Sequence, residues 1–492
     1  MFYFLSFLWF LRTTKSILFW VYLWQLKEYH IGRIRDHFQT EKGKGLLINK
    51  ILGFKIFLFA VYFILPLFVF FALTIFYMFE VVKLFFDLFR RRLKKPVLTK
   101  KTSLLILTGL LVELLILFFL VGSSVDIKSF ALWLLVFDIL APLVVSIIVL
   151  AFQPLAYYAR NMIIKRAREK REKFNNLLAI GITGSYGKTS TKEFLATILS
   201  EKFKVLKTKE HQNSEVGISQ CILQELKPEH QIFICEMGAY NRGGIKLLCS
   251  IAKPKIGILT GINEQHMATF GSQQNIISAK YELIESLPED GVAFFNGKNK
   301  YCRDLYEKTK IRKILYGTIP CESGRENILG AIAVAKELGM TSEEIGRGIE
   351  KVKDKIPGIQ VKNGINGLKI FDATYSANPD GVLAHLEYLK TLPGKKVIVM
   401  SCLIELGKAS AEVHQRIGKK IGEVCDLAII TTLDKFKEIK ETVGSKAMFM
   451  DNPKEIFEKV KSFCKEGDVV LLESRVSHSL ERTKQLIDLL SC

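Results

Sequence analysis

The chain has 492 residues, of which 49% are hydrophobic, and its mean hydropathy of +0.21 is too high for an ordinary soluble protein. Its net charge of +21 is concentrated in residues 1–176, which hold 25 Lys and Arg against 10 Asp and Glu. Because these basic residues flank apolar runs, they are typical of segments beside anionic lipid, and a nucleic-acid partner is excluded.

The N-terminal third contains apolar runs long enough to cross a membrane as helices. Residues 104–121 and 130–152 are each long enough to cross the hydrocarbon core, which takes roughly 20 helical residues. Residues 56–79 form a third run, which Pro66 is expected to kink, and residues 80–95 continue it as a basic amphipathic stretch.

The first 24 residues leave the number of spans open at three or four. Arg12 and Lys15 would lie near the middle of a single crossing, which is unfavourable in hydrocarbon. Glu113 and Asp138, inside two of the other runs, are expected to face neighbouring helices.

The distribution of basic residues predicts the topology. Segments 90–101 and 160–173 are strongly basic, whereas the loop between the last two apolar runs has a single Lys. By the positive-inside rule, everything after residue 153 lies in the cytoplasm. We therefore expect a multi-pass protein of the bacterial cytoplasmic membrane, in contact with lipid, with membrane helices at residues 1–153 and a basic juxtamembrane linker at residues 154–176.

From residue 177 onward the pattern becomes α/β. Short β-rich runs alternate with helical patterns, which is typical of parallel sheets. These runs are LLAIGIT, QIFICEM, KIGILTGI, KVIVMSC, LAIITT and DVVLLES.

The first β-rich run leads into GITGSYGKTSTKEF, which indicates a strand, a glycine-rich loop and the start of a helix. The strict G-x-x-x-x-G-K-[ST] spelling fails at Ile182, but the context is that of a phosphate-binding loop. Backbone amides at a helix N-terminus, a lysine and a hydroxyl are the groups that bind a polyphosphate with Mg²⁺. The expected nucleotide-binding residues are Gly184, Ser185, Gly187, Lys188, Thr189 and Ser190.

Three further side chains are candidates for metal binding or catalysis. Glu236 ends the second β-rich run, at the sheet edge where ligands bind. A carboxylate there can hold Mg²⁺ or orient water, although a structural acid is an equal alternative. His266 and Lys280 follow the third run, and each taken alone is more typical of a structural histidine and a solvated lysine.

Taken in order, these motifs resemble the Mur ligase family, the ATP-dependent amide ligases of peptidoglycan precursor assembly. The matching segments are GSYGKTSTKE, NSEVG, EMGA, INEQHMATFGS, AKYEL, GRENILGAIAVA, YSANP and IELG. Through YSANP, EMGA and IELG the chain is most similar to the branch that adds D-Ala-D-Ala. The resemblance implies a P-loop central ATP-binding domain at 177–356 and a Rossmann-like C-terminal domain at 357–492, with a hinge at Pro357-Gly358. Together with the apolar runs, the expected fold class is α/β, with transmembrane helices ahead of these two domains.

The resemblance also implies a role for each candidate residue. Lys188 would hold the phosphates of ATP, and Thr189 with Glu236 would bind a first Mg²⁺. His266 and Lys280, the latter carbamylated into an acidic ligand, would hold a second Mg²⁺. Lys188, His266 and Lys280 would be the catalytic residues, because charge develops as an acceptor carboxylate forms an acyl phosphate. Contacts to the nucleotide or the cleft are implied for Asn327, Asp372, Tyr375 and Asn378.

Several positions depart from the family pattern. The paired aspartates before the tyrosine read Asp372-Ala373, the glycine-aspartate ahead of ELG reads Ser401-Cys402, and the expected histidine before the asparagine is Glu326. The family's N-terminal domain, which binds the UDP-sugar, has no counterpart. The acceptor is therefore either presented by lipid or UDP-linked and held by the two remaining domains.

Three functions are compatible with these features. The first is a membrane-anchored ligase that adds a D-Ala-D-Ala-like dipeptide or an amino acid to a peptidoglycan precursor. The second is a nucleotide-binding scaffold that has lost ligation and recruits cell-wall enzymes, which Ala373 and Cys402 favour. A P-loop transporter is least supported, because the chain has no second nucleotide motif.

Overall fold

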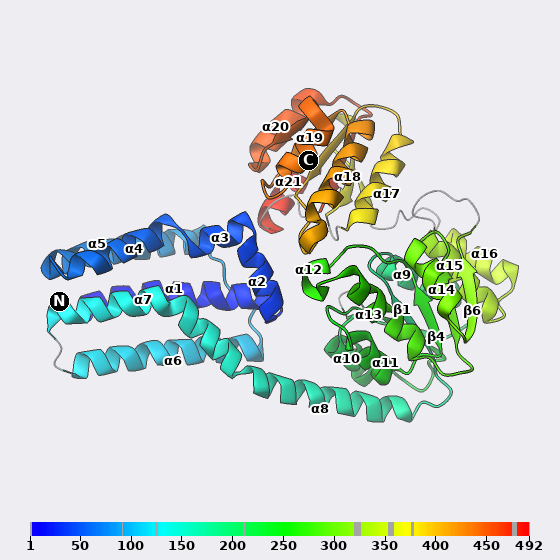
Figure 1. Ribbon diagram of the computed structural model, residues 1–492, viewed down its shortest axis with the longest axis horizontal. Coiled ribbons are helices and arrows are strands. Elements are labelled where there is room, and N and C mark those ends of the chain that lie inside the picture. Colours follow the sequence, from blue (N-terminus) through cyan, green and yellow to red (C-terminus); the bar gives the residue numbers. More distant parts are fainter. Residues whose placement is uncertain are drawn as a thin grey trace. The chain divides into compact units, whose positions relative to one another are not determined.

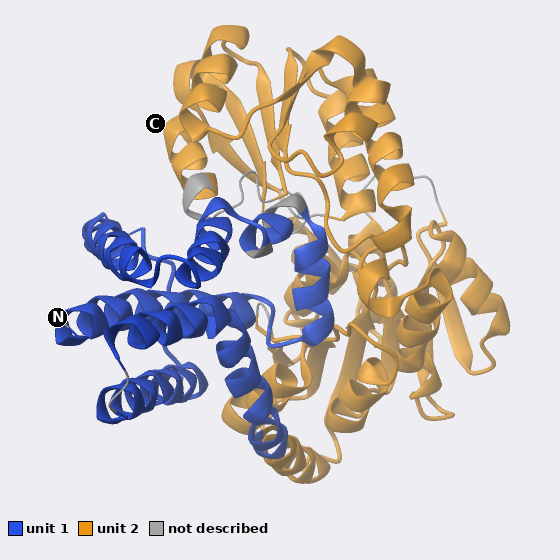
Figure 2. Ribbon diagram, turned by 60° about the vertical axis from the view of Figure 1, so that its left-hand side comes forward, with its two compact units in different colours: residues 1–159 blue, residues 160–492 orange. Residues whose placement is uncertain are grey.

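The computed structural model describes residues 2–90, 92–123, 126–209, 212–318, 326–352, 359–374, 378–474 and 480–491. The chain forms two compact units, residues 1–159 and residues 160–492 (Figure 2). Each unit has hydrophobic clusters of its own.

The described residues of the first unit form only helices (Figure 1). These are α1 (Phe2–Leu26), α2 (Ile31–Gln39), α3 (Glu41–Leu47), α4 (Lys50–Tyr62), α5 (Pro66–Phe89), α6 (Lys100–Gly122), α7 (Ile127–Ala151) and the start of α8 (Gln153–Glu172). Five stretches are long and apolar enough to cross a membrane, judged by length and composition: Phe2–Leu26, Gly43–Tyr62, Pro66–Phe89, Lys100–Gly122 and Ile127–Glu172. The sequence predicted three or four such stretches.

Pro66 separates two helices instead of kinking one. The run expected at 56–79 is divided between α4, which ends at Tyr62, and α5, which begins at Pro66. Proline is tolerated at the first position of a helix because the N–H it lacks would have no partner there, whereas in the interior it removes a hydrogen bond. Helix α5 continues to Phe89, so most of the stretch expected at 80–95 belongs to the same helix.

Buried charges join three helices of this unit. The side chain of Asp138 in α7 is fully buried, and its two oxygens lie 2.9 Å from Arg12 Nη1 of α1 and 2.7 Å from Lys55 Nζ of α4. A buried charge is tolerated only when it is paired. This ion cluster therefore explains how Arg12 is accommodated within an apolar helix.

The second unit contains two α/β domains. The middle domain has a sheet of six parallel strands in the order β2-β3-β1-β4-β5-β6. Its strands are β1 (Leu178–Thr183), β2 (Val205–Lys207), β3 (Ile232–Glu236), β4 (Ile256–Leu259), β5 (Val292–Asn296) and β6 (Arg312–Tyr316). Its helices are α9 (Lys188–Leu199), α10 (Glu215–Glu225), α11 (Gly244–Ala252), α12 (Met267–Phe270), α13 (Gln273–Glu285), α14 (Lys300–Lys308), α15 (Glu326–Glu337) and α16 (Ser342–Glu350).

The C-terminal domain has a six-stranded sheet in the order β11-β10-β9-β12-β8-β7, in which only β7 runs antiparallel to its neighbour. Its strands are β7 (Gln360–Asn363), β8 (Lys369–Ala373), β9 (Lys396–Met400), β10 (Leu427–Ile430), β11 (Ala447–Phe449) and β12 (Val469–Glu473). Its helices are α17 (Pro379–Lys390), α18 (Ser410–Val424), α19 (Phe436–Val443), α20 (Pro453–Phe463) and α21 (Leu480–Ser491), with 3-10 turns at Ile365–Gly367, Gly407–Ala409 and Gly444–Lys446. All six β-rich runs form parallel strands, which confirms the predicted α/β fold.

The segment expected as a basic linker, residues 154–176, is mostly helix, because α8 runs to Glu172. Ile164 and Ala167 are buried in the core of the middle domain. Arg171 is also buried, and its guanidinium donates hydrogen bonds to three backbone carbonyls, those of Ala252 at 2.9 Å, Phe174 at 2.8 Å and Leu177 at 3.0 Å. These bonds fix the end of α8 to the start of the domain.

Replacing Arg171 with Met should destabilise the middle domain by about 3 kcal/mol, because three buried carbonyls lose their donor and each unsatisfied group costs about 1–3 kcal/mol. Urea titration of the full chain measures the loss. The matched control is Arg166→Met on the exposed face of the same helix, which should change the free energy of unfolding by less than about 0.5 kcal/mol. Equal stability of the two variants would contradict the role of Arg171.

Candidate functional site

The loop between β1 and α9 depends on two glycines. Gly184 and Gly187 have φ angles of 154° and 76°, values that side chains disfavour. A Cβ on Gly187 would also collide with the side chain of Asn327, and one on Gly184 would collide with Thr260. The close approach of these neighbours therefore explains why glycine is needed at both positions.

The same loop is tied to the segment that follows β4. The backbone amide of Ser185 donates to the carbonyl of Gly261 at 2.7 Å, and the amide of Asn263 donates to Ser185 Oγ at 3.2 Å. The hydroxyl of Thr260 donates to the carbonyl of Tyr186. The loop is thus held from its side by the neighbouring strand.

Lys188 begins α9 at the end of this loop. Its Nζ donates to the carbonyl of Gly184 at 2.7 Å and to that of Ser185 at 3.3 Å. Burial lowers the pKa of Lys188, and the charge of Glu236 partly offsets this effect. A half-buried cation held over a glycine loop at a helix N-terminus fits a phosphate group. Ser190 lies half-buried in the first turn of the same helix.

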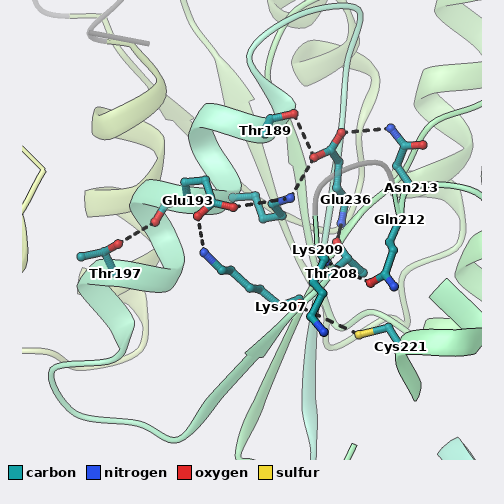
Figure 3. Close-up of polar contacts among 11 residues, drawn as sticks. Thr189, Glu193, Thr197, Lys207, Thr208, Lys209, Gln212, Asn213, Cys221 and Glu236 are labelled. Carbon is teal, nitrogen blue, oxygen red and sulfur yellow. Dashed lines mark hydrogen bonds and ion pairs between the residues drawn. The ribbon is translucent and has the colours of Figure 1, made fainter. Parts of the chain in front are cut away.

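Glu236, the last residue of β3, lies beside the start of α9 (Figure 3). Its Oε2 accepts a 3.0 Å hydrogen bond from Thr189 Oγ1, and its Oε1 accepts one of 3.1 Å from Asn213 Nδ2. Burial by itself raises the pKa of Glu236, but the charges of Lys188 and Lys192 and these hydrogen bonds outweigh it and lower the pKa. The carboxylate is therefore ionised beside a hydroxyl, which is a pair of ligands that Mg²⁺ accepts.

Lys192 and Asn213 were not singled out from the sequence. Lys192 Nζ is fully buried and lies 3.3 Å from Glu236 Oε2. Lys192 follows Lys188 by one helical turn. This i, i+4 spacing in the sequence places both lysines on the same face of α9, and it could have predicted a second cation near the end of β3. Asn213 belongs to the NSEVG segment, which has no chemistry of its own until the fold brings it to Glu236.

His266 precedes α12 with a left-handed backbone, at φ 65°. Its Nδ1 lies 2.6 Å from Glu405 Oε2 of the C-terminal domain, and the ring of Tyr240 packs edge-on at 5.0 Å. Burial lowers the pKa of His266, and the Glu405 carboxylate partly offsets this. The charges of Lys280 and Lys188 lower it further, so the three basic groups share one electrostatic neighbourhood.

Lys280 lies on α13 and is only 3% exposed. Burial lowers the pKa of Lys280 to about 7, and the nearby charge of Lys188 acts in the same direction. The ring of Phe270 is 5.8 Å from its Nζ. Much of the Lys280 amine is therefore uncharged at neutral pH, unlike that of a solvated lysine.

Asn327 lies in the first turn of α15, against the glycine loop. Its Oδ1 accepts a 3.3 Å hydrogen bond from Thr191 Oγ1 of α9. The structure therefore brings Asn327 to the loop that carries Lys188.

The remaining candidate residues belong to the C-terminal domain, whereas the glycine loop belongs to the middle domain. Asp372 in β8 accepts from Lys362 Nζ at 2.7 Å and from Thr374 Oγ1 at 2.7 Å, so both of its oxygens are bonded within the domain. Asn378 caps α17 and also accepts a 3.3 Å bond from Asn263 Nδ2 of the middle domain. Tyr375 and the expected hinge at Pro357-Gly358 lie outside the described residues.

Among the described residues no group of three or more His, Cys, Asp and Glu could hold a metal ion. The candidate metal ligands therefore include side chains other than His, Cys, Asp and Glu. Thr189 and Glu236 are one candidate pair, and His266 with Lys280 is the other, provided that the lysine carries an added carboxylate. An unmodified lysine is a poor metal ligand, since metal ligands must be deprotonated.

The buried amine of Lys280 predicts a pH dependence of stability. Its pKa of about 7 lies below the unfolded value of 10.5, so between these values the unfolded chain binds more protons and stability rises with pH. In urea titrations between pH 8 and 9.5, the free energy of unfolding of the wild type should rise relative to Lys280→Met by about 1.4 kcal/mol per pH unit. Lys310→Met, at an exposed position, should run parallel to the wild type. Parallel curves for Lys280→Met would contradict the low pKa.

Two family models match this chain: the Mur ligase middle domain over residues 182–360 and the Mur ligase glutamate ligase domain over residues 359–475. A UDP-N-acetylmuramoyl-tripeptide--D-alanyl-D-alanine ligase of Synechocystis sp. is 32% identical over 268 residues, which cover 49% of this chain and 59% of that protein. The ligase of the same name from Bacillus subtilis is 28% identical over 347 residues, covering 63% of this chain and 76% of its own length.

A solved structure supports the same fold. The MurF ligase from Thermotoga maritima, determined in complex with ADP, superposes with a TM-score of 0.58 at 26% identity. The match covers 67% of this chain and 83% of that one. The expected α/β fold of a Mur ligase, with two sheets, is thereby confirmed.

The relatives correct the expected localisation. The sequence predicted a multi-pass protein of the bacterial cytoplasmic membrane, but the matching proteins are soluble cytoplasmic ligases. The helices of residues 1–159 are apolar by composition, and the family models include none of them.

The remaining expectations on enzyme class agree with the relatives. A Mur-type ATP-dependent peptide ligase was predicted, and the named relatives are ligases of this type. Mur ligases use ATP and Mg²⁺, and the glycine loop with Lys188, Thr189 and Glu236 fits both. The chain belongs to the Mur ligase family.

Proposed function

We propose that this protein is an ATP-dependent ligase that joins D-Ala-D-Ala, or a similar dipeptide or amino acid, to a peptidoglycan precursor through an acyl phosphate. The observation that carries the proposal is the buried cluster at the end of β3, where Thr189 contacts Glu236 at 3.0 Å beside the cation of Lys188. The substrate class is taken from the relatives, which are UDP-N-acetylmuramoyl-tripeptide--D-alanyl-D-alanine ligases.

The reaction that this proposal entails has two steps. A carboxylate oxygen of the acceptor attacks the γ-phosphorus of ATP, and the bond from that phosphorus to the bridging oxygen breaks to give ADP and an acyl phosphate. The amine of the dipeptide then attacks the acyl carbon and loses a proton, and inorganic phosphate leaves. Negative charge develops on phosphoryl oxygens in both steps, so preorganised cations stabilise the transition states.

The first metal position is proposed at Thr189 and Glu236. Bound Mg²⁺ would supply electrostatic stabilisation of phosphate oxygens. Lys188 would release its bonds to the Gly184 and Ser185 carbonyls and bind phosphate with the same amine. Lys192 would keep Glu236 ionised from the other side.

A second metal position is proposed at His266 and a carbamylated Lys280. Carbamate formation needs an uncharged amine, which adds to carbon dioxide and loses a proton, and the low pKa of Lys280 supports this. The product is a carboxylate-like group that can bind Mg²⁺. Asn327, beside the glycine loop, is proposed to contact the nucleotide.

The C-terminal domain is proposed to receive the peptide substrates, with Asp372 and Asn378 facing the cleft. A scaffold that has lost ligation is the second candidate. It is favoured by Ala373 in place of an expected aspartate and by Asp372, whose oxygens are both bonded within the domain. Under this alternative, ATP binds without being turned over.

Phosphate release from ATP and Mg²⁺ separates the two candidates. The purified full chain is supplied with UDP-MurNAc-tripeptide alone, with this acceptor and D-Ala-D-Ala, and with the lipid-linked acceptor and D-Ala-D-Ala. We expect release only when acceptor and dipeptide are both present, a product heavier by the dipeptide less water, and at least a 100-fold loss in Lys188→Ala. ATP binding without release in any mixture would instead support the scaffold, and unchanged turnover in Lys188→Ala would contradict the phosphate-loop assignment.

The carbamate predicts a chemical rescue. Lys280→Ala should lose most of its ligase activity, and short carboxylic acids such as formate or acetate should restore part of it by occupying the vacated space. The same acids should leave the rate of Lys188→Ala unchanged, because that variant lacks a cation and not a carboxylate. Wild-type activity in Lys280→Ala would contradict the carbamate.

A further inference from the structure

The short segment after β4, residues 263–268, carries the polar contacts between the middle and C-terminal domains. The paired side chains are Asn263 with Asn378 at 3.3 Å and with Asp380 at 2.7 Å, Glu264 with Arg416 at 3.2 Å through two bonds, and His266 with Glu405 at 2.6 Å. Only the contact of His266 involves a residue proposed to hold metal.

Glu405 approaches this segment with its backbone as well as with its side chain. Its carbonyl accepts a 3.1 Å hydrogen bond from the amide of Ala268, two residues beyond His266. Its backbone has a φ of 65°, a left-handed conformation that is unfavourable for glutamate. The neighbouring Gly407 packs closely on Ala268, since a Cβ at Gly407 would lie 3.2 Å from the amide nitrogen of Ala268. The Glu405 turn is therefore fitted to the His266 turn.

We propose that Glu405 is the positioning residue for His266, so that the C-terminal domain sets the metal affinity of the middle domain. A carboxylate can only accept hydrogen bonds, so the proton of the neutral imidazole is held on Nδ1 and the lone pair is left on Nε2. Carboxylates that bond the far nitrogen of a metal-binding histidine fix its tautomer and ring orientation in this way. The inference rests on the proposed role of His266.

This arrangement makes metal binding and the seating of the C-terminal domain thermodynamically linked. A domain that supplies Glu405 raises the affinity of His266 for metal, and bound metal must favour the seated domain by the same factor. Metal binding in the middle domain and the seating of the C-terminal domain are then coupled through the hydrogen bond between His266 and Glu405.

The direct test is Mn²⁺ binding to the full chain, followed by electron paramagnetic resonance in bicarbonate buffer with a non-hydrolysable ATP analogue. The wild type should bind two Mn²⁺ ions. Glu405→Gln keeps the shape of the side chain and removes its charge, and it should weaken one ion about 10- to 100-fold while leaving the other unchanged. Glu264→Gln is the matched control, because it removes a different carboxylate of the same interface, one whose side chain bonds Arg416 and not His266. It should bind both ions as the wild type does.

A second readout reports the ring itself. In ¹⁵N spectra of labelled histidines, the resonances missing from His266→Ala identify His266 among the eight histidines. Without metal, the wild type should show the Nδ1-protonated tautomer. Glu405→Gln should shift the resonances toward a tautomer mixture, a change that loss of packing alone does not cause in Glu264→Gln.

The outcomes separate this inference from the proposed function. If His266→Ala still binds two Mn²⁺ ions, the proposed metal role of His266 is wrong. If His266→Ala loses one ion but Glu405→Gln binds both with wild-type affinity, only the positioning role is overturned. An equal loss in Glu405→Gln and Glu264→Gln would also overturn it, since the effect would then belong to the interface as a whole.

Discussion

The candidate site depends on keeping one carboxylate charged in a buried place. Glu236 lies at the end of a fully buried strand, where desolvation favours its neutral form. Two lysines from α9, one turn apart, and hydrogen bonds from Thr189 and Asn213 reverse that preference. The glycine loop, the start of α9 and the end of β3 must therefore fold together, because the ionised state of Glu236 depends on all three.

The segment after β4 is the second element on which the arrangement relies. At one end Thr260 and Asn263 brace the glycine loop, and at the other His266 meets Glu405. A single stretch of chain thus contacts both the phosphate-binding loop and the C-terminal domain. The hydrogen bond between His266 and Glu405 joins the two domains directly, without involving the sheet.

In the first unit, ion pairing accommodates charged residues inside apolar helices. Arg12 and Asp138 look unfavourable when each is considered within its own apolar helix, yet they lie 2.9 Å apart, with Lys55 on the other oxygen of the aspartate. Pro66 was also misjudged, since a helix start and a helix kink have the same local sequence. The apolar composition correctly predicted helices in this unit. The membrane location that was also predicted from it is contradicted by the relatives.

The sequence by itself determined the α/β pattern of residues 177 onward and the identity of Lys188, Thr189, Glu236, His266 and Lys280 as candidates, because strand periodicity and the glycine loop are local features. It missed six strands, namely the edge strands β2, β6, β7 and β11 and the inner strands β5 and β8. Only the tertiary structure decided that Lys192 and Asn213 meet Glu236 and that Glu405 meets His266 across 139 positions. Such contacts form only when the strands and domains are brought together in the folded protein. The same is true of burial, which lowers the pKa of Lys280 to about 7.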